Sequence, residues 1–108
     1  MIPPGLTFKQ ATQKGYIKPI RNKAYTDWVK SLPCCVCGKP ADDPHHIIQV
    51  GYGGKGTKAS DLWTIPLCRE HHDEIHKGVD AWEFAHGMQF EFVALTLLQA
   101  VHDGVIEL

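Results

Sequence analysis

The sequence predicts a small α+β fold assembled around bound metal. The chain has 108 residues, enough for one domain with a modest core that a bound metal would help to stabilise. Two short-spaced pairs of metal-binding side chains, Cys34-x-x-Cys37 and Cys68-x-x-His71, lie on either side of two short apolar stretches. Helical periodicity precedes and follows this central part. Together these observations predict strands and helices held by a metal site.

The chain divides into an arm and one domain. Residues 1–19 contain Pro3, Pro4 and Pro19 and show no sustained period, so we expect an extended or irregular arm. Residues 20–108 are predicted to form a single domain, with the metal-binding core over 34–78 and helices over 79–103. Within it, residues 20–32 are predicted to form an amphipathic helix that ends at Pro33. The apolar positions that indicate this helix are Ala24, Tyr25, Trp28, Val29 and Leu32.

The central segment predicts a turn and a β-hairpin. Residues 34–38 have the composition of a zinc knuckle, a tight turn in which backbone amides point at thiolate sulfur. Residues 45–50 and 61–67 are predicted to be two strands joined by a glycine-rich loop. The loop lacks the phosphate-binding P-loop pattern, but Lys55 and Lys58 within it could contact phosphates of a nucleic acid.

Helices are predicted for the rest of the chain. Residues 68–76 form the first, in which His72 and His76 are four residues apart and share one face. The aromatic and aliphatic residues over 79–103 predict two more helices that supply core rather than a ligand site. His86 and His102, isolated in this part, are expected to be ordinary surface or hydrogen-bonded residues.

Charge and composition give weaker indications. The net charge is −1, but the first thirty residues are basic and the part from Ala59 onward is mainly acidic. A basic half could meet a polyanion, although such blocks are more often solvated faces. We find neither a membrane-spanning apolar run nor a signal peptide, so the protein is expected in the cytoplasm. There, cysteines favour metal binding over disulfides.

A first metal site is predicted at Cys34, Cys37, Cys68 and His71. Two short-spaced pairs on separate elements are what a closed tetrahedral zinc site requires. The alternative is a set of buried, metal-free cysteines beside a surface histidine. Cys35 is poorly spaced to share the ion with Cys37, and we expect it to be a small buried filler.

A second, open metal site is predicted at His45, His72 and His76 if the hairpin packs against the helix. Three imidazoles leave coordination positions for water or a phosphate oxygen, as a catalytic divalent ion requires. His46 should point away from His45 along the strand, and a histidine beside a metal is suited to act as general base. The alternative is that these histidines are ordinary surface or core residues.

Over residues 28–98 the sequence resembles the HNH, or ββα-metal, nucleases. It is most similar to the zinc-containing phage and prophage type related to the RecA-dependent phage nuclease. The resemblance rests on Leu-Pro-Cys-Cys-Val-Cys-Gly at 32–38, His-His-Ile at 45–47, Ser-Asp-Leu-Trp-Thr-Ile-Pro-Leu-Cys at 60–68, and the histidines at 71, 72 and 76. It implies a two-strand, one-helix metal core that binds a structural zinc ion and a catalytic divalent ion, either Mg²⁺, Mn²⁺, Ni²⁺ or Zn²⁺.

The resemblance also implies roles for individual residues. His46 would activate water against a DNA phosphodiester, and His45 and His72 would bind the catalytic metal. His76 would be a further ligand or a phosphate contact. Asp61 stands where the family has an asparagine that orients the base or binds the metal, and its carboxylate retains an oxygen for either task. The expected products carry 5′-phosphate and 3′-hydroxyl ends.

Nucleic-acid contacts are expected to be electrostatic. No base-reading helix is apparent, so affinity should come from phosphate contacts and fall with salt. The candidates are Arg21, Lys23, Lys55 and Lys58. The resemblance further suggests phage or prophage DNA metabolism and a recruiting partner such as a recombination filament. Two alternatives stay open: a zinc-containing module that binds nucleic acid without cutting it, and an adaptor that binds proteins through its acidic, apolar C-terminal helices.

Overall fold

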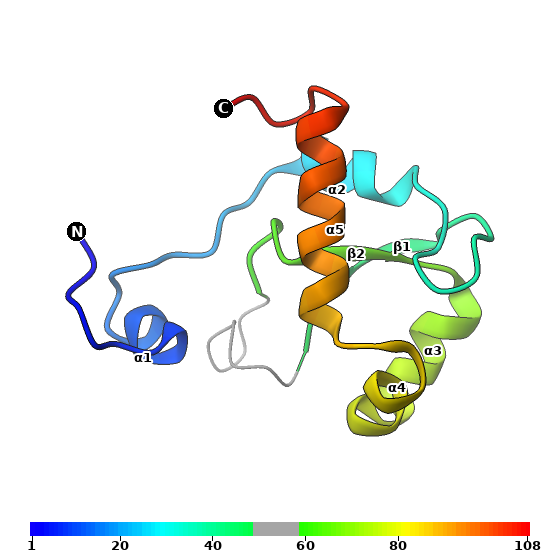
Figure 1. Cartoon of the computed structure of the whole chain (residues 1–108), viewed down its shortest axis with the longest axis horizontal. Helices are drawn as coiled ribbons and strands as arrows, with labels where there is room; N and C mark the ends of the chain where they lie inside the picture. Colours follow the sequence, from blue (N-terminus) through cyan, green and yellow to red (C-terminus); the bar gives the residue numbers. More distant parts are fainter. Residues whose placement is uncertain (49–58) are drawn as a thin grey trace.

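The computed structural model describes residues 1–48 and 59–108, and within these it confirms the α+β class. Two strands and five helices follow one another along the chain (Figure 1). In order they are α1 (Phe8–Gln13), α2 (Lys23–Lys30), β1 (Asp43–His46), β2 (Thr64–Leu67), α3 (Arg69–Lys77), α4 (Val79–His86) and α5 (Gln89–His102).

The two strands form an antiparallel sheet that positions the candidate site. His45 pairs with Ile65 and His46 with Thr64. Helices α2 and α5 both contact β2, and α3 follows β2 directly, with Cys68 as its N-cap residue (Figure 1). The sheet edge that carries the histidines is therefore close to the helix that carries the other predicted ligands.

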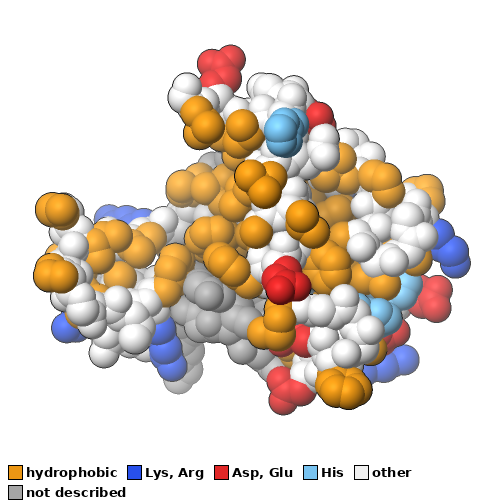
Figure 2. Space-filling view, viewed as in Figure 1, with side chains coloured by type: hydrophobic (Ala, Val, Ile, Leu, Met, Phe, Trp, Pro, Cys, Tyr) orange, Lys and Arg blue, Asp and Glu red, His pale blue; other side chains and the backbone are white. Residues whose placement is uncertain are grey.

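The core lies between the sheet and the C-terminal helices. Ile65 and Leu67 of β2, Ile75 of α3, Trp82 of α4 and Val93 of α5 are almost completely buried in one cluster. This confirms that the last two helices supply core. They also carry exposed apolar side chains, and Figure 2 shows hydrophobic side chains along the visible face of α5. Within the described residues, no helix is long and apolar enough to cross a membrane.

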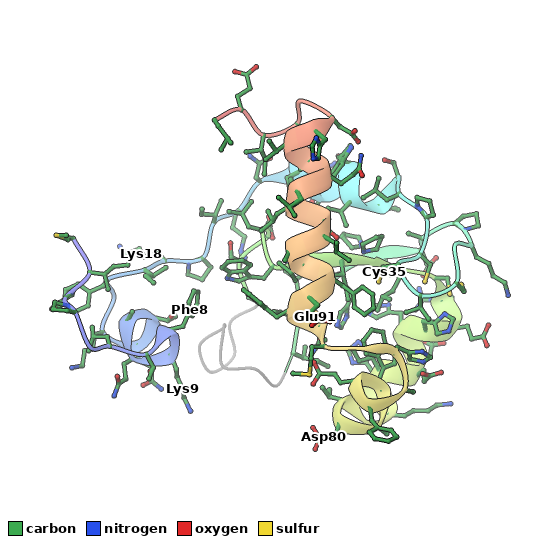
Figure 3. The ribbon with its side chains drawn as sticks, viewed as in Figure 1. Phe8, Lys9, Lys18, Cys35, Asp80 and Glu91 are labelled. Carbon is green, nitrogen blue, oxygen red and sulfur yellow. The ribbon has the colours of Figure 1, made fainter. Side chains whose placement is uncertain are left out.

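The expectation that residues 1–19 lack regular structure is wrong at Phe8–Gln13, which form α1. The helix begins with a capping box, in which Thr7 and Gln10 each bind the other's backbone N–H. This local pattern outweighs the prolines and glycines around it. The helix lies apart from the others, and the Phe8 side chain points toward the domain and meets Trp63 edge-on, with ring centroids 5.8 Å apart (Figure 3).

The predicted strand boundaries were also wrong. The strands cover 43–46 and 64–67 rather than 45–50 and 61–67, and residues 49–50 lie outside the described part. Residues 60–63 form a turn because side chains supply local hydrogen bonds: Ser60 Oγ accepts from Leu62 N–H, and Thr64 Oγ1 donates to the Asp61 carbonyl. Helix α2 likewise begins at Lys23, because the Asn22 side chain caps it.

Candidate functional site

Four side chains from two parts of the chain form a group that could hold a metal ion, which we call the sulfur cluster. They are Cys34, Cys37, Cys68 and His71, and their ligand atoms all lie within 4.8 Å of one another. Cys37 Sγ is 3.7 Å from Cys68 Sγ, and Cys34 Sγ is 3.8 Å from His71 Nδ1. The sequence pairs predicted for the first metal are therefore brought together.

The turn at residues 34–38 favours a thiolate at Cys34. Burial raises the pKa of this thiol, but hydrogen bonds from the backbone amides of Cys68, Cys37 and Val36 outweigh burial, and the net pKa lies below 9.0. Gly38, at φ +78°, closes the turn with a hydrogen bond to the Cys34 carbonyl. The backbone thus prepares one sulfur to bind a cation.

Cys35 belongs to the core rather than to the sulfur cluster. Its backbone N–H binds the Pro66 carbonyl at 2.9 Å, which ties the turn to β2, and its side chain packs against the main core (Figure 3). Burial raises the pKa of its thiol to about 12, so Cys35 stays protonated at neutral pH. Cys35 thus packs against the core as predicted, but it is only partly buried.

Three histidines form a second group that could hold a metal ion, the histidine cluster. His45 of β1 meets His72 and His76 of α3, with ring centroids 5.1 and 5.6 Å away. The Nε2 atoms of His72 and His76 are 3.1 Å apart, and all three residues offer ligand atoms within 4.8 Å. The hairpin packs against α3 in the way that the predicted second site required.

Burial favours the neutral form of two members of this cluster, His45 and His72. It lowers the pKa of His45 to about 4, and it also lowers the pKa of His72. Both imidazoles are therefore neutral at pH 7, which is the form that binds metal. His72 Nδ1 is buried without a hydrogen-bond partner among the described residues, and a carboxylate oxygen of Asp43 lies 4.0 Å away.

His46 and Asp61 form a hydrogen-bonded pair beside the histidine cluster. His46 Nε2 is 2.8 Å from Asp61 Oδ1. Burial raises the pKa of the Asp61 carboxyl, but the hydrogen bonds from His46 and the Asn22 backbone outweigh it, and the net pKa lies below 3.8. An ionised carboxylate only accepts hydrogen bonds, so His46 carries its proton on Nε2 and leaves Nδ1 free to accept one.

Asp61 has further donors, all from the start of α2. Its Oδ2 accepts the Asn22 backbone N–H at 2.7 Å, and Arg21 Nη1 lies 3.5 Å from Oδ1. The Asp61 backbone N–H in turn binds the Ile20 carbonyl at 2.8 Å. The segment before α2 therefore holds the carboxylate in place, a function that the sequence did not indicate.

A cleft of about 470 Å³ lies over these groups. It is lined by Asp43, Pro44, His45, His46, Ile48, His72 and His76. His46 faces Asp61 and His45 faces α3, as expected for neighbours on a strand, yet both border the cleft. A ligand in the cleft would therefore meet both His46, which is bound to Asp61, and the histidine cluster.

Two of the four residues predicted to contact nucleic acid, Arg21 and Lys23, belong to the described part of the chain. Lys55 and Lys58 lie outside the described residues. Lys23 pairs with Asp27 at 2.6 Å on the exposed face of α2. Arg21 donates to the Ala59 carbonyl at 2.7 Å, and its side chain is still about half exposed beside Asp61.

Two features of the site were missed in the sequence. The fully buried Gln89 binds His45, with 3.1 Å between Gln89 Oε1 and His45 Nε2. His86, expected to be ordinary, binds Glu74 at 2.5 Å, and its ring meets His71 edge-on. Both contacts join segments that are distant in the sequence, so residue spacing gave no signal for them. The one available signal for Gln89 was that it is a polar residue in a mainly apolar helix.

Comparisons with known proteins give a family but no activity. A family model described as "Protein of unknown function (DUF968)" matches residues 10–104. The "Uncharacterized protein YdfU" of Escherichia coli (strain K12) is 51% identical over 82 residues, which cover 76% of this chain and 24% of that protein. The chain thus spans about a quarter of this relative's length, and no solved structure matches it. From these matches, the chain belongs to the DUF968 family.

Proposed function

We propose that this domain is a metal-dependent DNA endonuclease of the HNH type. The observation that carries the proposal is that His46, which is hydrogen-bonded to Asp61, borders the same cleft as the histidine cluster. A general base held by a carboxylate, next to ligands for a divalent ion, is the equipment that phosphodiester hydrolysis needs. The arrangement agrees with the HNH resemblance of the sequence.

The histidine cluster supports a catalytic metal. Two imidazole nitrogens about 2.1 Å from one ion lie about 3.0–3.4 Å apart at coordination angles between octahedral and tetrahedral, and the His72 and His76 nitrogens are 3.1 Å apart. A divalent ion bound there would supply positive charge to a phosphate oxygen and the leaving 3′ oxygen. His76 is exposed and the cluster opens into the cleft, so positions for substrate remain.

The sulfur cluster supports a structural zinc. Zinc–sulfur bonds of about 2.3 Å in a tetrahedron place two sulfurs about 3.8 Å apart, and Cys37 and Cys68 are 3.7 Å apart. Three thiolates and one imidazole fill a tetrahedral shell and leave no place for substrate. This site would join the turn at 34–38 to the start of α3, and so hold α3 against the sheet.

In the proposed reaction, Nδ1 of His46 accepts a proton from the water molecule that attacks the phosphate. Its Nε2–H remains bound to Asp61, which holds the ring in one orientation and stabilises the imidazolium that forms. The side chains of Arg21 and Lys23 are candidates for contacts with phosphates flanking the cut. Because those contacts are electrostatic, binding should weaken steeply as salt concentration rises.

The test is cleavage of plasmid and single-stranded DNA by the zinc-loaded protein with Mg²⁺, Mn²⁺, Ni²⁺ or added Zn²⁺. We expect cutting only when a second divalent ion is present, with 5′-phosphate and 3′-hydroxyl ends. Salt-sensitive DNA binding without cutting under any ion would instead favour a binding module. A recruiting partner, such as a recombination filament, would then be tested by adding it to the same assay.

Asp61→Asn is expected to lower the free energy of unfolding by about 1–3 kcal/mol, because one of two hydrogen bonds to an ionised carboxylate would be lost. Asp61 uses both oxygens, one for His46 and one for the Asn22 backbone N–H, whereas asparagine offers only one. Chemical denaturation measures the loss. The control is Asp27→Asn on the exposed face of α2. Equal stability of the two variants would show that one oxygen suffices at position 61.

A further inference from the structure

Gln89 connects α5 to the end of β1 through three side-chain hydrogen bonds. Its side chain is fully buried, although it is a polar residue at the first position of a mainly apolar helix. Oε1 lies 3.1 Å from both His45 Nε2 and the Ile48 backbone N, and Nε2 lies 2.8 Å from the Ile48 carbonyl oxygen. The backbone N–H of Gln89 is itself accepted by Glu83 Oε2 at 2.8 Å.

The backbone of Ile48 fixes which way the Gln89 amide faces. A backbone N–H can only donate and a carbonyl oxygen can only accept, so the amide oxygen must face the Ile48 N–H and the amide nitrogen its carbonyl. A flipped amide would set donor against donor and acceptor against acceptor. The atom beside His45 is therefore an oxygen, with only acceptor capacity.

The same reasoning fixes the proton on His45. An oxygen that only accepts requires an N–H from His45 Nε2, at 3.1 Å. The neutral ring has one proton, so Nδ1 has a free lone pair. One ring nitrogen of His45 lies within 4.8 Å of the ligand atoms of His72 and His76, and with Nε2 bound to Gln89, Nδ1 is the nitrogen left to bind an ion.

We propose that Gln89 is a positioning residue that locks His45 in the Nε2-protonated form and so makes Nδ1 its metal-binding atom. Its consequence for DNA cleavage rests on the proposed function, whereas the proton position does not. Histidine ligands of metals commonly donate their second ring nitrogen to such a partner. The proposal gives α4 and α5 a second role, because they orient a residue of the site besides filling the core.

A purely structural role for Gln89 gives different expectations. Burying an amide costs free energy that its bonds to Ile48 could offset without help from His45. In that case Gln89→Met would lower stability but leave the His45 proton and metal affinity unchanged. Gln89→Glu separates the two roles further, because a neutral glutamic acid can donate to the Ile48 carbonyl and still offer His45 an oxygen.

The experiment begins with the zinc-loaded wild-type protein before a second metal is added. Long-range ¹H–¹⁵N correlation spectra of the histidine rings should show His45 protonated on Nε2. Titration with Ni²⁺ then measures the second site. We expect Gln89→Met to weaken Ni²⁺ binding by about 10–100-fold, as loss of such a partner typically does, and Gln89→Glu to stay close to wild type. Both variants should keep the zinc.

The matched control is Thr96→Val, which removes a buried hydroxyl that binds the Phe92 carbonyl in the same helix but has no contact with His45. It should lower stability without changing Ni²⁺ affinity. The proposal is overturned if wild-type His45 is protonated on Nδ1, or if Gln89→Met binds Ni²⁺ as tightly as Thr96→Val. If the protein gives the expected spectra and Ni²⁺ affinities but never cuts DNA, the role of Gln89 is supported and the proposed nuclease function is rejected.

Discussion

His46→Ala is expected to slow DNA cleavage by about 10²–10⁴-fold, the usual contribution of a general base. Among the described residues, only His46 both borders the cleft and forms a hydrogen bond with Asp61 through its side chain. The substitution removes its imidazole. The ligands in the sulfur cluster and the histidine cluster would all remain. Single-turnover cleavage of plasmid DNA, with zinc content and thermal unfolding measured on the same sample, checks this.

His102→Ala is the control for a histidine lost elsewhere. His102 ends α5 and is exposed. The control should cut DNA at the wild-type rate. If His46→Ala retained zinc and fold and still cut DNA as fast as His102→Ala, His46 would not be the base, and the mechanism proposed above would be wrong.

Cys34→Ser is expected to abolish the proposed zinc binding at the sulfur cluster and, with it, cooperative folding. Zinc bound to small structural sites contributes about 10–16 kcal/mol, whereas whole domains are stable by only about 5–15 kcal/mol. Cys34 also lies in the main core, and its backbone closes the 34–38 turn, because its N–H binds the Lys39 carbonyl and its carbonyl accepts the Gly38 N–H. Metal content by mass spectrometry and far-UV circular dichroism measure the loss, and a strong zinc chelator added to the wild type should reproduce it.

Cys35→Ser makes the same chemical change one residue further along the chain. Because Cys35 stays a protonated thiol beside the core, its replacement should leave the zinc in place and cost only part of the stability. The comparison therefore separates loss of a ligand from loss of a cysteine. If Cys34→Ser kept the wild-type zinc content and folding, as Cys35→Ser is expected to, the sulfur cluster would not be a structural metal site.

The sequence predicted the elements better than their ends. Periodicity identified α2, α3, α4 and α5, and the apolar stretches identified an antiparallel pair of strands. The boundaries differed where polar side chains bind nearby backbone. Asn22 begins α2 later than expected, Ser60 and Thr64 form a turn instead of strand, and the Thr7–Gln10 capping box forms α1 in a segment rich in proline and glycine.

The ligand groups could be predicted because metal binding imposes short spacings on a sequence. Cys34-x-x-Cys37, Cys68-x-x-His71 and the His72–His76 pair each belong to one turn or helix, and the fold brings them together as expected. The roles inferred for His46 and Asp61 stay predictions, although the two side chains are in contact. Lys55 and Lys58 lie outside the described residues.

The supporting contacts could not be predicted, because each joins segments far apart in the chain. Asn22 meets Asp61, Gln89 meets His45, and His86 meets Glu74 beside His71. None of these pairs has a characteristic spacing, since their separation is set by how α2, α4 and α5 pack on the sheet. Residues that orient a site can therefore be identified only from coordinates, whereas residues that could bind an ion can be predicted from the sequence.

The most direct test of the whole account is to titrate the zinc-loaded protein with Mn²⁺ while measuring plasmid cleavage and Mn²⁺ binding on the same sample. The account predicts one zinc held throughout, one further ion bound, and cleavage that rises in parallel with occupancy of that second site. It would be contradicted by a second ion that binds fully while the plasmid stays intact, or by cleavage that proceeds at the same rate without it.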